Sequence, residues 1–407
     1  MKTRFFVCLL MAGVLVWGCS SNSSPPGPEP VRELTADEVA VVQSQTTFGW
    51  NLFRTIVSQE PDTNCFISPL SVSMALGMTY NGSNGDTREA MEDVLAVQGL
   101  SPEQINQAYR GLIDVLESLD PQVTMEIANS IWYRRGFTVK STFQALCSKY
   151  FDAAIKDLDF EDPNSVDVIN SWVNDNTRGK IPKILDLIKP SDVMFLIDAI
   201  YFKAQWTYRF DPESTSPGPF HVSDGETMTC NFMHQHATYP YGHGDHFEAI
   251  KLDYGNRQFA MIVLLPTEGY TADQVLEGMD DAHWNAMLAS FFGAELDLVM
   301  PKFKQEYTIK LNDALTAMGM GIAFSRSEAD FSGISENQQL FIDNVMHKTF
   351  VQVDEEGTEA AAVTSVTIGT TALPPVSFVV NRPFVFVITD EHTHAIAFVG
   401  KIVRPNL

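Results

Sequence analysis

The stretch of sequence that decides the fold is Glu355-Glu356-Gly357-Thr358-Glu359-Ala360-Ala361-Ala362-Val363-Thr364. It lies between two β-like runs, residues 349–353 and 383–388, and no charged residue follows Glu359 until Arg382. Small and β-branched residues fill this interval, a composition typical of a central strand. The first proline is Pro374, so every earlier backbone N–H can join a sheet. A loop that can become a central strand indicates a stored conformational change.

One face of this segment would carry only uncharged side chains if it became a strand, because strand side chains alternate between two faces. The residues on that face are Thr358, Ala360, Ala362, Thr364, Val366 and Ile368. Burying such a face avoids the desolvation of a charge. The segment therefore has the properties of a strand that can enter a closed sheet.

Five further stretches lie in a fixed order along the chain: Asn64-Cys65-Phe66-Ile67-Ser68-Pro69-Leu70-Ser71, Thr79-Tyr80-Asn81-Gly82-Ser83, Ala199-Ile200-Tyr201-Phe202-Lys203-Ala204-Gln205-Trp206, Asn381-Arg382-Pro383-Phe384-Val385-Phe386 and Phe398-Val399-Gly400-Lys401-Ile402. Together with residues 355–364, they resemble the motifs of the serpin family of serine protease inhibitors. The resemblance covers roughly residues 38–405. Six motifs in the family's order are much more specific than any one of them.

The resemblance implies an α+β serpin-like fold with mixed, mostly antiparallel β-sheets and about eight or nine helices. It also implies an exposed reactive-centre loop at about residues 355–376. The implied function is irreversible suicide-substrate inhibition of serine proteases, with cysteine proteases as further targets. The cleaved loop would insert into the main sheet and trap a covalent acyl-enzyme, so the chain would be an inhibitor rather than an enzyme. Insertion of a serpin loop into a sheet is a known switching transition.

The resemblance assigns further residues to the parts of this mechanism. The hinge, where insertion would begin, comprises Glu355, Gly357, Thr358, Glu359, Ala360, Ala361 and Ala362. The shutter, where the sheet would open, comprises Ser68, Ser71, Asp198 and His347. The breach, above the point of insertion, comprises Trp206 and Lys302, and Glu355 is expected to pair with Lys302. The family usually has asparagine where this chain has Asp198.

Asp198 allows two interpretations. As a carboxylate beside His347, it would form a charge-assisted pair and raise the pKa of the histidine. Alternatively, it accepts only the hydrogen bonds that asparagine would accept.

Burial of Thr358 is expected to accompany insertion of the loop.

The reactive bond is predicted within one residue. Counting the family spacing from Gly357 gives the bond between Thr371 and Ala372, and counting back from Pro383 gives the bond between Ala372 and Leu373. Both bonds follow a small uncharged side chain, which suits elastase-like or subtilisin-like proteases better than trypsin.

Two other functions are the alternatives to a protease inhibitor: a non-inhibitory serpin that carries a ligand, and an envelope hydrolase. The small uncharged residues at the inward positions of the hinge, Thr358, Ala360 and Ala362, argue against the first, and the lack of a recognisable nucleophile motif argues against the second.

The N-terminus predicts export. Lys2 and Arg4 precede an apolar run over residues 5–16, which is short for a membrane span and typical of a signal peptide. The following sequence, Leu15-Val16-Trp17-Gly18-Cys19-Ser20, resembles a bacterial lipobox. We therefore expect a signal peptide over residues 1–18, lipidation of Cys19, a flexible tether over 19–35, and one serpin domain over 36–407. Ordinary signal cleavage at another site is the alternative. The lipid would hold the protein at the membrane of the bacterial cell envelope, outside the cytoplasm.

The net charge restricts the partners. The chain carries 27 basic and 51 acidic residues, for a formal net charge of −24. A negative field of this size disfavours nucleic acid. The region that is a basic heparin-binding helix in some serpins has one basic residue, Arg110, so we expect no glycosaminoglycan binding. The expected partners are a target protease and, through the lipid, a membrane; the protein is expected to be a monomer without a cofactor.

The histidines and cysteines are the candidate metal ligands and nucleophiles of the chain. His234, His236, His243 and His246 occur close together, and alternation along a strand would place His234 and His236 on one face. Because no HExxH or CxxC motif accompanies them, we expect solvated histidines and no metal site. Besides Cys8 and Cys19 near the N-terminus, the chain has Cys65, Cys147 and Cys230, each in an apolar context that predicts a buried free thiol.

Hydrophobic periodicity predicts the order of elements. Helices are expected at residues 36–58, 69–80, 87–94, 104–119 and 166–176, the last ended by Gly179. Strands are expected at residues 123–133, 195–202, 259–265, 295–300, 341–346, 350–353, 376–380, 384–388 and 395–403.

Overall fold

The structure is a computed structural model that describes residues 31–189, 191–222, 225–336, 340–358 and 376–406. Residues 33–407 form one compact unit. Its described helices are α1 (Ala36–Gln59), α2 (Pro69–Tyr80), α3 (Gly85–Leu95), α4 (Pro102–Ser118), α5 (Ser141–Phe151), α6 (Ser165–Asn176), α7 (Ala272–Glu277), α8 (Asp281–Ala289) and α9 (Asn312–Leu315). The predicted α+β class, with mixed and mostly antiparallel sheets, is confirmed.

The described strands form two sheets. The strands are β1 (Cys65–Ile67), β2 (Val123–Arg134), β3 (Ala154–Leu158), β4 (Met194–Gln205), β5 (Ser216–His221), β6 (Thr227–Gly244), β7 (Phe247–Tyr254), β8 (Phe259–Pro266), β9 (Phe292–Pro301), β10 (Phe303–Lys310), β11 (Met346–Asp354), β12 (Gly357–Thr358), β13 (Val376–Val379), β14 (Phe384–Asp390) and β15 (Ile396–Ile402). A nine-stranded sheet has the order β1-β15-β14-β8-β7-β6-β9-β13, with β5 paired to β6, and a six-stranded sheet has the order β10-β11-β12-β4-β2-β3. Within these ladders, only β2–β3 and β9–β13 are parallel.

Capping residues in the sequence determine where α1 and α2 begin. Thr35 caps α1 in a capping box: its hydroxyl accepts from the backbone N–H of Glu38, and the Glu38 carboxylate accepts from the N–H of Thr35. Ser68 caps α2, because its hydroxyl accepts from the backbone N–H of Ser71. Pro69 occupies the first helical position. All residues of α2 are buried, because this helix contacts both β4 and β15. The shutter residues Ser68 and Ser71 therefore lie between the two sheets.

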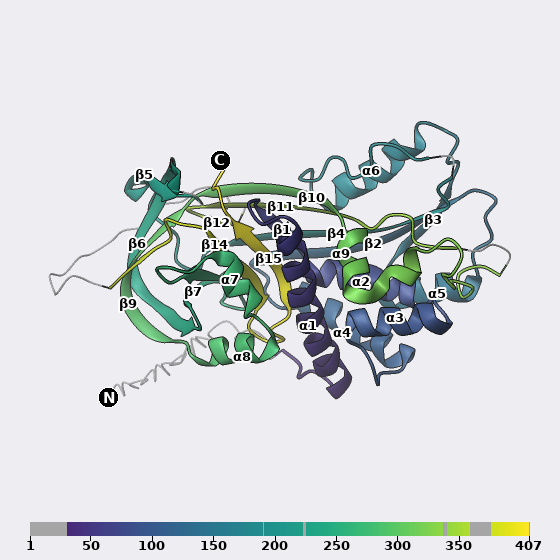
Figure 1. Cartoon of the computed structure of the whole chain (residues 1–407), viewed down its shortest axis with the longest axis horizontal. Coiled ribbons are helices and arrows are strands. Elements are labelled where there is room, and N and C mark those ends of the chain that lie inside the picture. The colour runs from purple at the N-terminus through teal and green to yellow at the C-terminus, as the bar shows by residue number, and fades with distance from the viewer. Residues whose placement is uncertain (1–30, 190, 223–224, 337–339, 359–375, 407) are drawn as a thin grey trace, which may run out of the picture. The chain divides into compact units, whose positions relative to one another are not determined.

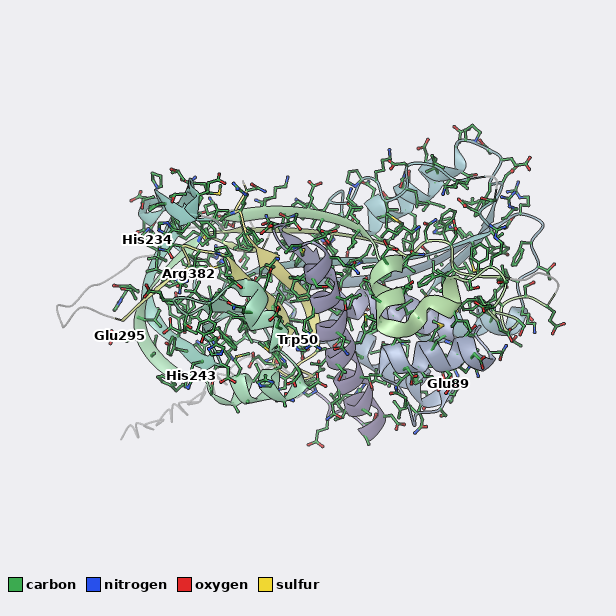
Figure 2. All side chains as sticks on the ribbon, viewed as in Figure 1. Trp50, Glu89, His234, His243, Glu295 and Arg382 are labelled. Atoms are coloured by element: carbon green, nitrogen blue, oxygen red, sulfur yellow. The ribbon has the colours of Figure 1, made fainter. Side chains whose placement is uncertain are left out.

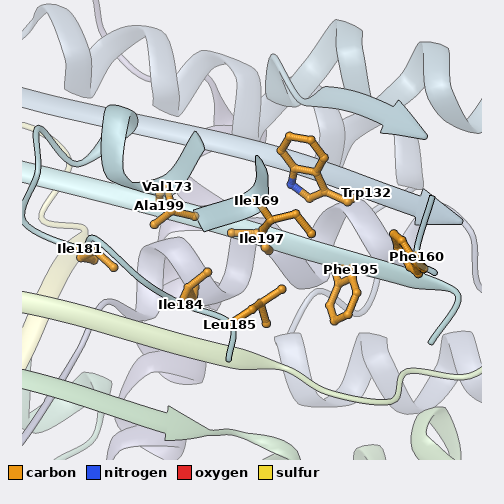
Figure 3. Close-up of a cluster of buried hydrophobic side chains, with 10 residues drawn as sticks. All are labelled: Trp132, Phe160, Ile169, Val173, Ile181, Ile184, Leu185, Phe195, Ile197 and Ala199. Carbon is orange, nitrogen blue, oxygen red and sulfur yellow. The ribbon is translucent and has the colours of Figure 1, made fainter. Parts of the chain in front are cut away.

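The six-stranded sheet is covered on both sides. Figure 1 shows α6 on one side of it and α2 and α4 on the other. Alternation along β4 sends Phe195, Ile197 and Ala199 toward α6, where they pack with side chains of β2, α6 and the segment after α6. Figure 3 shows this cluster, which comprises Trp132, Phe160, Ile169, Val173, Ile181, Ile184, Leu185, Phe195, Ile197 and Ala199. The intervening residues of β4, among them Asp198, face α2.

The predicted end of α6 is confirmed. The helix stops at Asn176, Gly179 takes a φ of 82°, and its N–H donates to the carbonyl of Asn174 at 2.8 Å. This arrangement is a glycine-based helix end, in which a residue with positive φ returns its N–H to the last turn. It turns the chain back across the six-stranded sheet.

The strand predicted at residues 341–346 is wrong for all but its last residue, because β11 begins at Met346. The side chain of Asn312 pins this backbone instead: it donates to the carbonyl of Asp343 at 3.0 Å and accepts from the N–H of Val345 at 2.9 Å. Aspartate and asparagine at 343 and 344 are also poor strand formers.

Candidate functional site

The hinge begins as a strand within the six-stranded sheet. Thr358 lies opposite Val353 of β11 on one side and Ala204 of β4 on the other, and Gly357 continues both ladders by one residue. Gly357 has a φ of 149°, and a Cβ at this position would lie 2.2 Å from the carbonyl oxygen of Ala204. Only glycine allows the backbone to approach β4 this closely. The two-residue strand β12 therefore depends on Gly357.

Thr358 is already buried in the described structure, with 3% of its surface exposed. Its hydroxyl is 2.7 Å from the hydroxyl of Tyr254, whose own surface is fully covered. The expectation that Thr358 becomes buried only when the loop inserts is therefore wrong. The reason is the tight turn at Glu355 and Glu356, which folds β12 directly back against β11.

The breach residues meet around the turn between β11 and β12. Lys302 Nζ donates to Glu355 Oε2 at 2.6 Å, and the Thr215 hydroxyl donates to Glu355 Oε1 at 2.7 Å. Burial opposes ionisation of Glu355, but the hydrogen bonds from Lys302 and Thr215 prevail and hold its pKa below the ordinary value. The predicted proximity of Glu355 and Lys302 is thus present, and the pair fixes the turn to the residue between β9 and β10.

Trp206 lies beneath the same turn. Its indole N–H donates to the carbonyl of Asp354 at 2.9 Å, and its backbone N–H donates to the carbonyl of Glu356 at 2.9 Å. The indole ring stacks on Tyr254 with ring centroids 4.4 Å apart. Trp206 therefore connects the turn to β7, on the nine-stranded sheet.

Beyond Thr358, a slot remains between β4 and β11. No ladder joins these two strands in the described ranges, although both continue past the end of β12. A hollow of about 10 Å³ marks the slot and is lined by Ile200, Tyr201 and Phe202 of β4, Phe350, Val351 and Gln352 of β11, Thr358, and Thr177, Lys180 and Ile181 after α6. This volume is close to the space of one water molecule. A further strand could enter only if β4 and β11 moved apart and the segment after α6 gave way.

The four shutter residues come together beneath the slot. Ser68 N–H donates to His347 Nε2 at 3.0 Å, and the Ser68 hydroxyl donates to the carbonyl of Ala397 at 2.7 Å. The Ser71 hydroxyl donates to Asp198 Oδ1. These contacts link α2 to β4, β11 and β15.

Of the two interpretations of Asp198, the charge-assisted pair with His347 is wrong. Across the described ranges, no hydrogen bond or ion pair joins the two side chains, and Asp198 Oδ2 is buried without a partner. Burial raises the pKa of Asp198 to about 8, although the Ser71 hydrogen bond opposes this, and burial lowers the pKa of His347 to about 4. His347 Nε2 also accepts the hydrogen bond from the Ser68 N–H, and this requires the uncharged ring. Desolvation therefore suppresses both charges.

Several predicted residues lie outside the described ranges: Glu359, Ala360, Ala361 and Ala362 of the hinge, Thr371, Ala372 and Leu373 of the reactive bond, and Cys19. Glu355, Gly357 and Thr358 are the described part of the hinge. No helix in the described ranges is both long enough and apolar enough to cross a membrane.

The histidines on β6 make local contacts. His236 lies 2.7 Å from Asp297 and 3.3 Å from Glu295, and these two carboxylates raise its pKa. Figure 2 shows His234 and Glu295 at one end of the nine-stranded sheet, with His243 nearer to α8. Within the described part of the chain, no group of three or more His, Cys, Asp or Glu side chains is placed to hold a metal ion.

Cys65, Cys147 and Cys230 are buried free thiols, as the sequence predicts. Burial raises the pKa of Cys147 to about 12 and that of Cys230 to about 11. A nucleophilic cysteine needs a lowered pKa, so neither thiol is suited to nucleophilic chemistry.

Two residues of the site, Tyr254 and Asn129, were not predicted from the sequence. Tyr254 supports both Trp206 and Thr358. Asn129 lies opposite Asp198 and donates to the carbonyl of Phe151 at 3.0 Å. Neither residue stands in a recognisable motif, because each acts through contacts with residues distant in sequence.

Comparison with known proteins agrees with this geometry. Residues 43–405 match the serpin family (serine protease inhibitor). An uncharacterized serpin-like protein of Thermococcus kodakarensis is 32% identical over 379 residues, which cover 91% of this chain and 87% of the relative. The leukocyte elastase inhibitor of Bos taurus is 32% identical, with 89% of this chain and 98% of the relative covered.

The solved structures give the same result. The crystal structure of the thermophilic serpin tengpin in its native state superposes with a TM-score of 0.83 and 32% sequence identity, covering 92% of this chain and 96% of tengpin. The chain belongs to the serpin family. Serpins are generally protease inhibitors rather than enzymes, and relatives of this chain include protease inhibitors.

Proposed function

We propose that this serpin irreversibly inhibits serine proteases by inserting its cleaved loop into the slot between β4 and β11. One observation carries the proposal: β12 already occupies the first positions of that slot, paired to both neighbours. Continuing the two ladders from Thr358 would pair Ala360 with Phe202 and with Val351. The strand needed to close the six-stranded sheet would therefore be supplied by the residues that follow Thr358.

The chemistry begins on the target enzyme. The protease serine attacks the carbonyl carbon of the residue before the reactive bond, the peptide bond breaks, and the C-terminal peptide leaves as an amine. The loop remains joined to the protease by an ester. Inhibition results if the loop inserts and displaces the protease before water hydrolyses this ester.

The energetic gain comes from the new ladder. Residues 359–371 would add 13 residues, about 43 Å at ~3.3 Å each. Each new hydrogen bond contributes roughly 0.5–1.5 kcal/mol net. Small inward-facing side chains at Ala360 and Ala362 would enter the slot without the cost of burying a charge.

We propose elastase-like or subtilisin-like enzymes as targets, with cysteine proteases as a further class. Thr371 and Ala372 are small and uncharged, and a bovine relative of this chain is named leukocyte elastase inhibitor. Trypsin-like enzymes would require a basic residue, and residues 359–381 contain none. A carrier serpin without inhibitory activity is the competing proposal.

The experiment is incubation with pancreatic elastase, subtilisin, papain and trypsin, followed by denaturing gels and mass spectrometry of the released peptide. We expect denaturant-resistant complexes with elastase or subtilisin and none with trypsin. Thr371→Arg should gain trypsin trapping if Thr371 precedes the reactive bond, whereas Ala372→Arg should gain it if Ala372 does. Loop cleavage without any complex would instead favour the carrier.

We further propose that Cys19 carries a lipid that anchors the protein to the cell envelope through a tether over residues 19–35. The lipobox-like sequence before Cys19 supports this proposal. The wild type should be found in the membrane fraction, and Cys19→Ser should be released or remain unprocessed. A mature N-terminus at any other residue, found by mass spectrometry, would overturn the anchor.

A further inference from the structure

Asp120 is a buried carboxylate in the turn between α4 and β2, with 3% of its surface exposed. It accepts one hydrogen bond from the backbone N–H of Asn256 at 2.7 Å and one from the side-chain amide of Asn256 at 3.1 Å. The backbone N–H of Gln122 donates a third at 2.9 Å. A carboxylate forms stronger hydrogen bonds than a neutral acceptor does. Asp120 therefore fixes the turn between β7 and β8, which contains Asn256, to the chain that follows α4.

The β7–β8 turn fits tightly against Asp120. Gly255 has a φ of 50°, and a Cβ at this position would lie 2.7 Å from Asp120 Oδ2, so the close approach needs a glycine. The N–H of Gly255 donates to the carbonyl of Gln205 at 2.8 Å, and the carbonyl of Gly255 accepts from the Thr207 hydroxyl at 2.9 Å. The turn is thus held by Asp120 on one side and by the end of β4 on the other.

Tyr254 is the residue directly before this turn, and its side chain reaches the hinge. Its hydroxyl lies 2.7 Å from the hydroxyl of Thr358, and its ring stacks on Trp206. An isolated β-bridge also joins the backbones of Tyr254 and Trp206. Across the described ranges, the Thr358 hydroxyl has no other hydrogen-bond partner. The position of Tyr254 therefore decides whether this hydroxyl is satisfied.

Burial makes the contact between Tyr254 and Thr358 important. Both residues are almost fully covered, so a hydroxyl that lost its partner would find no solvent to replace it. The strand that this contact supports, β12, has only two residues. Ordering a residue costs conformational entropy. A hinge that is ordered before the loop is cut leaves less of that cost to the insertion step.

We propose that Asp120 is a positioning residue for the hinge: it fixes the β7–β8 turn so that the Tyr254 hydroxyl holds Thr358 between β4 and β11. The inference rests on the proposed function, because the ordered hinge matters as the starting point of insertion. Asp120 bonds to no hinge residue in the described part of the chain, so it acts through Asn256 and Tyr254. Loss of its bonds should loosen β12 and raise the ratio of ester hydrolysis to insertion.

The test is hydrogen exchange of the backbone amides of β12, measured by mass spectrometry on the full uncleaved protein. Tyr254→Phe removes the hydroxyl and keeps the ring, and Asp120→Asn keeps the side-chain shape but replaces one acceptor oxygen by a donor group. Each variant should speed exchange about two- to ten-fold, the range that one hydrogen bond supports. The double variant should exchange no faster than Tyr254→Phe. Asn256→Ala, which removes only the side-chain bond to Asp120, should give a smaller increase.

Asp280→Ala is the control for a general loss of stability. The Asp280 side chain caps α8 by accepting from the N–H of His283 at 2.9 Å, and α8 packs on α1 and β6. This variant should lower the melting temperature without changing exchange in β12. Unchanged exchange in Tyr254→Phe, equal increases in Asp120→Asn and Asp280→Ala, or multiplied increases in the double variant would overturn the positioning role.

Protease trapping links the hinge to inhibition. The readout is the number of inhibitor molecules consumed per trapped protease, because that number minus one is the ratio of hydrolysis to insertion. Tyr254→Phe and Asp120→Asn should each raise this ratio about two- to ten-fold, and Asp280→Ala should leave it unchanged. Faster exchange with an unchanged ratio would overturn the contribution of Asp120 to insertion. A wild type that forms no complex with any protease would instead overturn the proposed function, whatever the exchange result, so the two failures are distinguishable.

Discussion

The breach and the shutter hold the same sheet closed by opposite means. At the breach, Glu355 and Lys302 are charged and hydrogen-bonded to each other. At the shutter, Asp198 and His347 are buried, and their charges are suppressed. At the beginning of the slot, paired charges hold the sheet closed. At its middle, the sheet is held closed by polar groups that must stay neutral.

The largest expected effect comes from Thr358→Arg, at the point where the slot begins. Thr358 is buried against Tyr254, so an arginine there would be an unpaired buried charge costing several kcal/mol. We expect a less stable uncleaved protein and a loop that proteases cut without being trapped. Denaturing gels would show cleaved inhibitor in place of complex. Thr308→Arg, exposed on β10, is the control and should trap normally. Wild-type trapping by Thr358→Arg would refute the account of the hinge.

A smaller effect is expected when the breach pair is broken. Glu355→Gln keeps an acceptor for Thr215 but removes the charge that Lys302 binds, and we expect a loss of about 1–2 kcal/mol in the free energy of unfolding. The surface variant Glu226→Gln removes an ion pair to Arg404 and should cost less, because both of those side chains are exposed. Thermal denaturation of the two variants measures the difference. Equal losses would mean that partial burial of the breach pair has no energetic importance.

The pH dependence tests the shutter. Folded Asp198 keeps its proton up to about pH 8, whereas an unfolded aspartate loses it near its ordinary pKa of 3.8, so the free energy of unfolding falls as pH rises between these values. His347 opposes this trend. Its contribution to stability is present above the unfolded pKa of 6.5 and is lost as pH falls toward the folded value of about 4.

Between pH 6.5 and 8, the contribution of His347 is constant, so of these two groups only Asp198 changes the free energy of unfolding with pH. We expect the wild type to lose about 1–2 kcal/mol of unfolding free energy across this range. Asp198→Asn should be flat there and should lose stability only below pH 6.5. Denaturant unfolding at several pH values provides the measurement, with Asp86→Asn, exposed on α3, as a control. Parallel curves for the wild type and Asp198→Asn would show that Asp198 only replaces an asparagine.

Much of the fold could be predicted from the sequence, because its signals are local. The mostly apolar run of α2 begins at a Ser68-Pro69 cap, and the alternation in β11 agrees with its observed burial. The strand predicted at 341–346 failed because the side chain of Asn312, distant in sequence, pins that backbone. The sequence did not predict helices α5, α7, α8 and α9 or strands β3, β5, β6, β7 and β10. Their local hydrophobic patterns are weak, and tertiary contacts fix these elements instead.

The site was predicted in part. The grouping of Ser68, Ser71, Asp198 and His347 came from resemblance to a family, and the structure brings all four together. Their ionisation could not be predicted, because desolvation depends on what covers a side chain in three dimensions. For a similar reason, the sequence did not predict that Thr358 already lies in the sheet before the loop is cut. The composition of residues 355–364 shows that they can form a strand, but the register of β12 depends on β4 and β11.

The most direct test of the central claim is the melting temperature of the protein before and after cleavage within residues 363–372. If the cut loop inserts between β4 and β11, the new ladder should raise the melting temperature by at least about 10 °C. The stability of the uncut protein would then be kinetic in origin. Equal melting temperatures for the uncut and cut proteins would contradict loop insertion, and with it the proposed mechanism of inhibition.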